Sequence, residues 1–156
     1  MTTNPLDTML CFSLYAASRA TSQAYRAVLT EHDLTYPQFL VLVALDAEGD
    51  SSVVELGQLM FLDSGTLSPL LKRLERRGFV TRTRQPANER VLIVALTPAG
   101  AELRKVIADA VLPLNPAYGV DADGLAALLP QLHAIRTGMT DLTDKVRTTN
   151  TKELSL

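Results

Sequence analysis

The single cysteine of this 156-residue sequence, Cys11, is the side chain best suited to redox chemistry. A thiolate reduces peroxides, and the thiolate form is favoured near a helix N-terminus and by hydrogen-bond donors. Oxidation first gives a sulfenic acid. Because the chain has no second cysteine, that acid must condense with a low-molecular-weight thiol or with Cys11 of another copy, or be overoxidised. The alternative is that Cys11 is an inert small apolar residue, the commoner fate of a lone cysteine on a helix.

A lone cysteine also excludes an intrachain disulfide and fits a reducing, cytoplasmic compartment. The N-terminus lacks the basic region and apolar run of a secretory signal, and no uncharged apolar run reaches the roughly 18 residues of a membrane span. His32 and His133 accompany no cysteine cluster, so we expect neither a metal nor a cofactor. We find no Gly-rich phosphate loop or nucleophile elbow, so we do not expect an enzyme.

Positive charge is gathered in one stretch, from Lys72 to Arg90. The stretch contains seven basic and two acidic residues, a net charge of +5, in a chain whose net charge is −2. A concentrated basic surface on an acidic protein is typical of a polyanion-binding site. The alternative is an ordinary solvated face.

Two short helices lead into and through this basic stretch. Ser52 and Glu55 form a capping box that opens a helix ending at about Met60. A second helix follows Leu62-Asp63-Ser64 and ends at Gly78. Its expected inward face consists of Leu67, Leu70, Leu71 and Leu74, and its outer face largely of Thr66, Ser68, Lys72, Arg73 and Arg76. Two helices joined by a tight polar connection are the helix-turn-helix pattern.

Pro69 fits this second helix poorly, because a proline in a helix interior removes a hydrogen bond. The helix therefore begins at Ser68, or its first turn is irregular. The apolar runs 79–83 and 91–96, separated by a tip at Pro86, Ala87 and Asn88, predict a β-hairpin after the helix. A helix-turn-helix followed by a basic-tipped hairpin is a winged arrangement.

The flanking segments are expected to be helical. Apolar residues spaced by three or four predict a helix over about 6–29, Thr35 and Gln38 cap a buried helix, and Thr97-Pro98 starts another. The last helix, about 121–147, carries an apolar seam of three heptads, consisting of Leu125, Leu128, Leu132, Ile135, Met139, Leu142 and Val146.

Such a seam predicts a homodimer built from the terminal helices, although packing against the chain's own first helix is the alternative. The fold class we predict is therefore mainly α with a small β-hairpin wing, a winged helix-turn-helix dimerised through its N- and C-terminal helices. Residues 1–33 and 97–147 form the helical dimerisation region, 34–96 the DNA-binding region and 148–156 a loose tail.

Four segments together resemble the MarR family of dimeric winged-helix regulators. They are Leu34-Thr-Tyr-Pro-Gln-Phe-Leu-Val-Leu, Leu62-Asp-Ser-Gly-Thr-Leu-Ser-Pro-Leu-Leu-Lys-Arg-Leu-Glu, Gly78-Phe-Val and Leu96-Thr-Pro-Ala-Gly. With Leu10-Cys-Phe-Ser-Leu-Tyr near the N-terminus, the chain is similar to the OhrR subfamily of single-cysteine organic hydroperoxide sensors. That subfamily carries a proline at the place of Pro69.

The resemblance implies roles for individual residues. Cys11 would be the reactive cysteine, hydrogen-bonded by Tyr25 and Tyr36 of the partner subunit, with Tyr15 on the same helix as the cysteine. Arg90 would be the wing arginine that enters a minor groove. The family's wing acid, which orients this arginine, is replaced here by Asn88.

For DNA, the recognition helices of the dimer would enter successive major grooves of an inverted-repeat operator. The residues expected at the interface are Ser64, Gly65, Thr66, Ser68, Lys72, Arg73, Arg76 and Arg90. Arg76, Arg77, Arg82 and Arg84 could equally be phosphate contacts or exposed charge.

These observations predict a cytoplasmic repressor that releases its operator when an organic hydroperoxide oxidises Cys11, which then reacts with a low-molecular-weight thiol. One alternative is a MarR-type repressor released by a small aromatic ligand. The other alternative, from a different class, is a thiol peroxidase that uses the same cysteine to reduce peroxide repeatedly.

Overall fold

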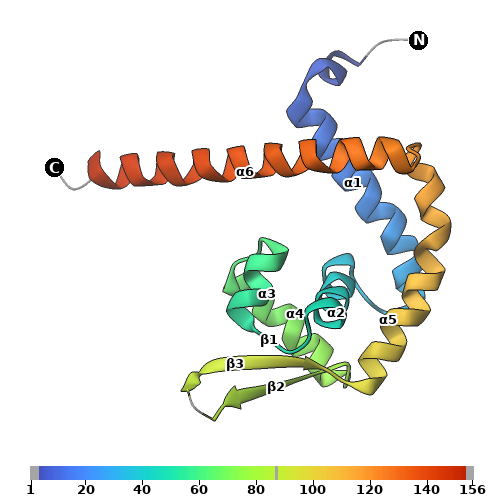
Figure 1. Ribbon diagram of the computed structural model, residues 1–156, viewed down its shortest axis with the longest axis vertical. Helices are drawn as coiled ribbons and strands as arrows, with labels where there is room; N and C mark the ends of the chain where they lie inside the picture. The colour runs from blue at the N-terminus through green and yellow to red at the C-terminus, as the bar shows by residue number, and fades with distance from the viewer. Residues whose placement is uncertain (1–3, 87, 154–156) are drawn as a thin grey trace. The chain divides into compact units, whose positions relative to one another are not determined.

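The computed structural model describes residues 4–86 and 88–153 of the chain (Figure 1). The chain divides into two compact units, Met1–Asn115 and Pro116–Leu156. The elements are α1 (Leu10–Leu29), α2 (Tyr36–Glu48), β1 (Ser51–Ser52), α3 (Val53–Met60), α4 (Ser64–Arg76), β2 (Val80–Gln85), β3 (Asn88–Leu96), α5 (Pro98–Val111) and α6 (Ala122–Glu153). Short 3-10 helices occupy Pro5–Thr8, Thr30–His32 and Leu112–Tyr118. The predicted fold class, mainly helical with a hairpin wing, is confirmed.

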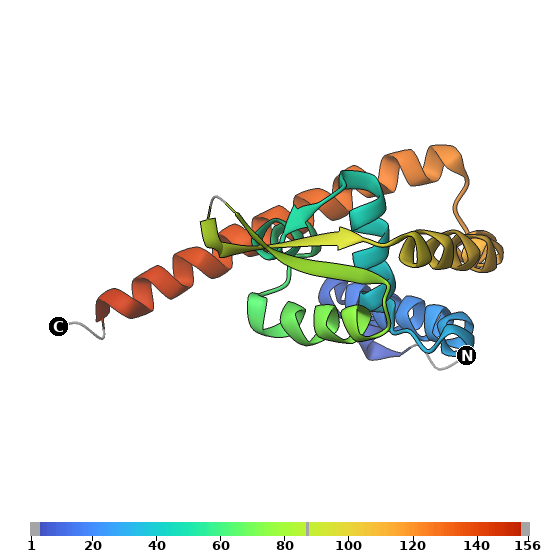
Figure 2. The ribbon, with the colours of Figure 1, turned by 90° about the horizontal axis from the view of Figure 1, so that it is seen from below.

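Helices α2, α3 and α4 pack with a three-stranded antiparallel sheet of order β1-β3-β2. The hairpin contacts all three helices and faces the viewer in Figure 2. We did not predict β1, because two serines between a glycine turn and a capping box carry no strand signal. Ser51 pairs with Val94 and Ser52 with Ile93.

The buried core of the first unit is built from aliphatic side chains of these helices and the sheet. Leu67, Leu71 and Leu74 of α4 are fully buried together with Leu42 of α2 and Leu56 of α3. Apolar burial on this scale contributes about 1.5–3 kcal/mol per side chain and fixes the position of α4 against α2 and α3. The predicted inward face of α4 is therefore confirmed, with Leu70 only partly buried.

The recognition helix α4 begins at Ser64 and runs through Pro69 to Arg76. Asp63 caps it, because its carboxylate accepts hydrogen bonds from the backbone N–H of Thr66 at 2.9 Å and from the hydroxyl of Thr66 at 2.9 Å. A start at Ser68 is thus wrong. Pro69 lacks the N–H that would bond the carbonyl of Gly65, but the cap and the buried leucines keep the helix continuous.

The first helix begins later than predicted. Residues Pro5–Thr8 form a separate 3-10 turn, and Met9 is extended (φ −96°, ψ 117°), so α1 starts at Leu10. The apolar spacing continues across this break, and for this reason periodicity alone merged the two segments. Cys11 consequently lies at the second residue of α1 rather than about six residues into a longer helix.

Helix α5 starts at the predicted Thr97 cap and packs against α1 and α2. A close approach occurs at Gly100, where a Cβ would stand 2.1 Å from the carbonyl oxygen of Phe79. Helix α5 belongs to the same unit as α1 and the winged region. The second unit comprises Pro116–Leu156. The grouping of 1–33 and 97–147 as a dimerisation region stays a prediction.

The second unit is formed mainly by α6, which Asp121 caps through a 2.8 Å hydrogen bond from the N–H of Gly124. The helix runs to Glu153, past residue 148, where we expect the loose tail to begin, and the looseness of this tail stays a prediction. Residues 154–156 lie outside the described residues. Within the described part of the chain, no helix combines the length and apolarity that crossing a membrane requires.

Candidate redox site and nucleic-acid interface

Cys11 is exposed at the second position of α1. The side chain of the N-cap residue Met9 makes no capping hydrogen bond. The carbonyl oxygen of Met9 accepts a 3.0 Å hydrogen bond from the backbone N–H of Ser13. The opening N–H groups of a helix have no intrahelical acceptor and carry partial positive charge.

Tyr25 and Tyr36 lie together at the other end of α1. Their ring centroids are 4.6 Å apart with an interplanar angle of 46°, and Phe39 lies 6.3 Å from Tyr25. Both tyrosines pack partly buried against the core. The pair joins the last turns of α1 to the first residue of α2.

Within one chain, Cys11 and this tyrosine pair are far apart. Cys11 and Tyr25 are fourteen positions apart in one continuous helix, which corresponds to about 21 Å along the axis at roughly 1.5 Å per residue. Tyr15 is also separate from the pair; it is 58% exposed, and its hydroxyl accepts a 3.2 Å hydrogen bond from Arg19. The structure thus brings together Tyr25 and Tyr36 but neither Cys11 nor Tyr15 with them.

The outer face of α4 is open to solvent. Ser64, Gly65, Thr66, Lys72, Arg73 and Arg76 are exposed and Ser68 is half-buried. The backbone N–H of Thr66, and then its hydroxyl, hold the pKa of Asp63 below its ordinary value of 3.8. Asp63 is thus ionised at neutral pH at the positive end of the helix.

The basic side chains of the stretch from Lys72 to Arg90 fall into two groups. Arg77 bonds the carbonyls of His32 and Asp33, Arg82 bonds Glu75, and Arg84 donates to the carbonyl of Glu89 at 2.7 Å. In the described residues, no side-chain hydrogen bond or ion pair is found for Lys72, Arg73, Arg76 and Arg90. The second group is therefore available to phosphates without breaking an internal contact, whereas each member of the first group already makes one.

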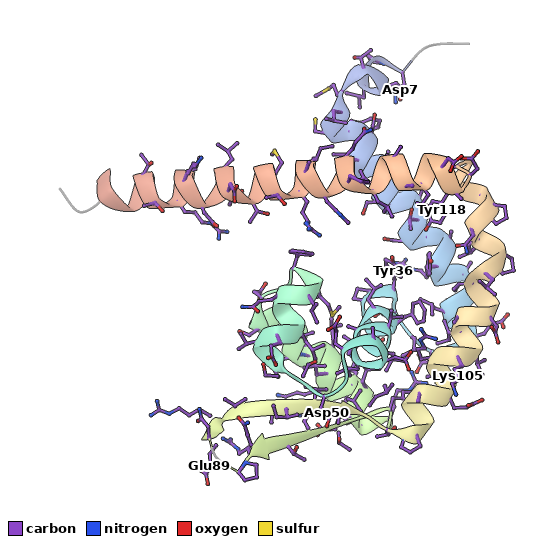
Figure 3. The ribbon with its side chains drawn as sticks, viewed as in Figure 1. Asp7, Tyr36, Asp50, Glu89, Lys105 and Tyr118 are labelled. Atoms are coloured by element: carbon purple, nitrogen blue, oxygen red, sulfur yellow. The ribbon has the colours of Figure 1, made fainter. Side chains whose placement is uncertain are left out.

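The wing is longer than predicted, with strands Val80–Gln85 and Asn88–Leu96. Glu89 lies at its far end (Figure 3). Asn88 accepts a 3.2 Å hydrogen bond from the backbone N–H of Arg90. Asn88 therefore bonds the backbone at the tip, and among the residues that the structure describes nothing is seen to orient the guanidinium of Arg90. Ala87 of the predicted tip lies outside the described residues.

A cleft of about 950 Å³ lies between the end of α1, the start of α2 and the C-terminal half of α4. Its lining includes Arg26, Tyr36, Arg73, Arg76 and Arg77. Sequence reasoning missed this cleft and the contact of Arg77 with residues 32 and 33. No local signal could have revealed the contact, since Arg77 and Asp33 are 44 positions apart in the sequence. Among the described residues, no group of His, Cys, Asp or Glu could hold a metal ion.

The fold and the exposed basic helix define a winged helix-turn-helix regulator. Comparison with known proteins makes the class specific, because the family model described as "MarR family" matches residues 34–92. The chain belongs to the MarR family of transcriptional regulators, as the resemblance predicted.

Individual relatives cover most of the chain. The HTH-type transcriptional regulator TtmR of Methylorubrum extorquens (strain PA1) is 44% identical over 144 residues, which are 88% of this chain and 73% of the relative. The organic hydroperoxide resistance transcriptional regulator of Bacillus subtilis (strain 168) is 38% identical over 135 residues, 82% of this chain and 92% of the relative.

Solved structures of AbfR of Staphylococcus epidermidis are also similar. Reduced AbfR bound to DNA has a TM-score of 0.73 and 32% identity and covers 86% of this chain and 94% of its own. Overoxidised AbfR bound to DNA has a TM-score of 0.72 and 33% identity, with the same coverage.

Proposed function

We propose that this protein is a homodimeric repressor that binds an inverted-repeat operator and releases it when an organic hydroperoxide oxidises Cys11. The observation that carries the proposal is the placement of Cys11, exposed in the first turn of the helix whose far end bears the Tyr25–Tyr36 pair. The similarity to the Bacillus subtilis organic hydroperoxide regulator supports the same reading.

A dimer would join the parts that one chain keeps apart. The N-terminal segment exposes Leu6, Met9 and Leu10, and α6 exposes an apolar series, Leu125, Leu128, Leu129, Met139, Leu142 and Val146. Exposed apolar side chains that gather on one segment are typical of a protein interface. If two copies pair through these segments with their α1 helices antiparallel, Cys11 of each meets the tyrosine pair of the other.

The DNA-binding surface would be α4 together with the wing. Side chains at the N-terminus of α4 would reach base edges in the major groove, while Lys72, Arg73 and Arg76 contact phosphates. Arg90 would enter a narrow, A·T-rich minor groove. The similarity to DNA-bound AbfR supports this use of the surface.

The sensing step would be a two-electron oxidation of Cys11. The thiolate attacks the terminal oxygen of the hydroperoxide, an S–O bond forms, the O–O bond breaks and an alcohol leaves. A low-molecular-weight thiol then attacks the sulfenic acid, which forms a mixed disulfide and releases water. Because an overoxidised AbfR binds DNA, we assign release to the bulky adduct rather than to added oxygen alone.

The test is a fluorescence anisotropy titration with operator duplex, before and after cumene hydroperoxide plus a small thiol. We expect the wild-type protein to lose the duplex and Cys11→Ser to keep it, with equal affinity before treatment. A Cys11→Ser protein that is still released would refute the proposal. Repeated consumption of peroxide without duplex binding would instead indicate the peroxidase.

A ligand-released regulator is the second candidate, and the 950 Å³ cleft beside Tyr36 favours it. In that case Cys11 has no redox role. Release of both the wild-type and Cys11→Ser proteins by a small aromatic acid, with no effect of peroxide, would support this candidate.

A further inference from the structure

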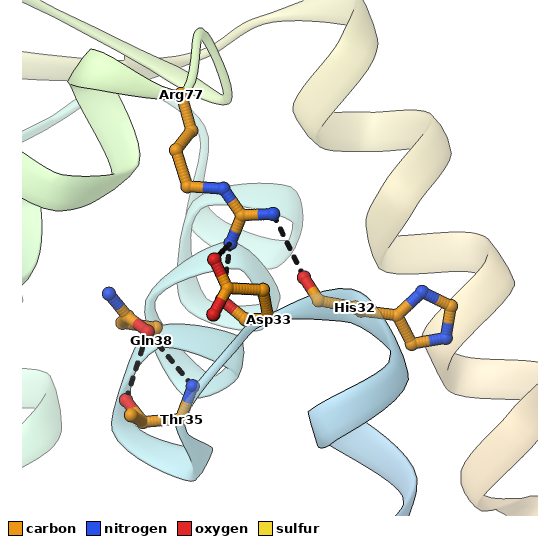
Figure 4. A network of polar contacts seen from close by, with 5 residues as sticks. All are labelled: His32, Asp33, Thr35, Gln38 and Arg77. Atoms are coloured by element: carbon orange, nitrogen blue, oxygen red, sulfur yellow. Dashed lines mark hydrogen bonds and ion pairs between the residues drawn. The ribbon is translucent and has the colours of Figure 1, made fainter.

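The C-terminal end of the recognition helix is tied to the junction between α1 and α2 (Figure 4). Arg77, the C-cap residue of α4, donates through Nη2 to the carbonyl of His32 at 2.9 Å and through Nη1 to the carbonyl of Asp33. The same Nη1 lies 3.7 Å from the carboxylate Oδ2 of Asp33. A planar guanidinium suits two successive carbonyls, because its donors diverge in a fixed geometry.

The turn that receives Arg77 is held in an uncommon conformation. Asp33 has φ 51° and ψ 43°, in the left-handed region that few residues other than glycine adopt. The Asp33 side chain is 94% exposed, so its ion pair with Arg77 contributes little. The two carbonyl hydrogen bonds are therefore the main attachment.

This turn directly precedes the tyrosine pair. His32 and Asp33 are followed by Leu34, Thr35 and Tyr36, and Gln38 accepts hydrogen bonds from the backbone N–H of Thr35 at 2.9 Å and from its hydroxyl at 3.1 Å. The turn is thus rigidly joined to the start of α2. Tyr36, whose ring contacts Tyr25, is the first residue of α2.

The other side of Arg77 is fixed as well. Its guanidinium carbon lies 4.8 Å from the centroid of the Phe79 ring. The carbonyl of Phe79 accepts a 3.1 Å hydrogen bond from the N–H of Thr97, and the carbonyl of Gly78 accepts a 2.7 Å bond from the Thr97 hydroxyl. Residues 77–79 therefore link the end of α4 to the α1–α2 turn and to the start of α5.

We propose that Arg77 is a positioning residue that couples the tyrosine-bearing α1–α2 junction to the orientation of the recognition helix. The inference rests on the proposed function, because it supplies the path by which a change at Tyr25 and Tyr36 reaches α4. A displacement of the junction moves the two carbonyls, and through Arg77 the C-terminal end of α4. Arg77 itself does not contact DNA.

The test compares Arg77→Lys, Arg77→Ala and the matched control Arg76→Ala in operator binding. For each protein the dissociation constant is measured before and after treatment with cumene hydroperoxide plus a small thiol, at several salt concentrations. Lysine keeps the charge but cannot present two fixed donors to the two carbonyls. We expect both Arg77 variants to lower the ratio of treated to untreated dissociation constants at least tenfold. The salt slope, which is the slope of the logarithm of the binding constant against the logarithm of the salt concentration, should not change.

Arg76→Ala should do the opposite, lowering the salt slope by about one unit and leaving the ratio intact. A wild-type ratio in Arg77→Lys, or a salt slope that falls by about one unit in Arg77→Ala, would overturn the proposal. The first result would mean that the contact is merely structural, and the second that Arg77 binds phosphate.

A second readout does not depend on peroxide. We expect duplex binding to slow amide hydrogen exchange at residues 32–36 several-fold in the wild-type protein but not in Arg77→Lys. Equal protection in both would overturn the coupling. If peroxide fails to release the wild-type protein, the proposed function is wrong, and the exchange measurement alone decides the role of Arg77.

Discussion

One carboxylate oxygen of Glu75 accepts two hydrogen bonds from Arg82, 2.9 Å from Nε and 2.5 Å from Nη2. The contact joins α4 to β2, and the Arg82 side chain is only 17% exposed. An arginine held in this way stabilises the fold, and the neighbouring Arg76, which is exposed, has no such partner in the described part of the chain.

Arg82→Ala should therefore lower the free energy of unfolding by about 1–2 kcal/mol, because it leaves a half-buried carboxylate without its donor. Its salt slope in duplex binding should equal that of the wild type. Arg76→Ala should show the reverse, with unchanged urea denaturation and a slope lower by about one unit. A loss of slope in Arg82→Ala would contradict the assignment of Arg82 to the fold.

Arg90→Ala tests the wing. The guanidinium of Arg90 is oriented by no contact in the described residues, and Asn88 bonds only its backbone. We expect operator affinity to fall and the salt slope to drop by about one unit. Asn88→Asp is the second variant to measure, because it restores the carboxylate that orients the wing arginine in the family. Unchanged affinity and slope in Arg90→Ala would mean that this wing does not touch DNA.

Tyr25→Phe and Tyr36→Phe keep the ring contact but remove the hydroxyl donors. We expect each to slow the reaction of Cys11 with cumene hydroperoxide about tenfold, because the sulfur loses a hydrogen-bond donor. Tyr118→Phe, at a half-exposed site outside the tyrosine pair, is the control. Rates equal to the wild type in both variants would exclude hydrogen bonding to the sulfur.

The helix caps predict a dependence of stability on pH. Hydrogen bonds from Thr66 lower the pKa of Asp63 from 3.8, and those from Ser52 lower the pKa of Glu55 from 4.5. A carboxylate whose pKa is lower in the folded protein contributes stability above its ordinary pKa and loses it as the pH falls through the folded value.

Asp63→Asn keeps an accepting oxygen but does not titrate. The urea concentration at the unfolding midpoint should therefore fall further for the wild type than for Asp63→Asn as the pH is lowered from 7 to below 3.8. Parallel curves for the two proteins would show that the cap carries no charge-dependent stability.

Local signals in the sequence predicted the elements of the winged region well. Caps such as Thr97 and Ser52 and the leucine spacing of α4 are decided within a few residues, so each could be read from the chain directly. The break at Met9 and the strand β1 were missed for the opposite reason. Each depends on contacts or dihedral angles that neighbouring residues do not specify.

The functional surface was less predictable than the fold. Counting charges could not distinguish Arg77 and Arg82, which hold the structure, from Arg73 and Arg76. The partner of Arg77 comes from a distant segment, and the partner of Arg82 lies across the contact between α4 and β2. The family resemblance, rather than spacing, linked Cys11 with Tyr25 and Tyr36. Within one chain the structure keeps that cysteine and those tyrosines at opposite ends of α1.

The most direct test of peroxide sensing compares the masses of bound and released protein. Operator-bound protein is treated with less than one equivalent of cumene hydroperoxide per subunit and a small thiol, and intact masses are measured for both fractions. We predict a thiol adduct on Cys11 in the released fraction and unmodified Cys11 in the bound fraction. The same distribution of masses in both fractions would contradict the link between oxidation of Cys11 and release of DNA.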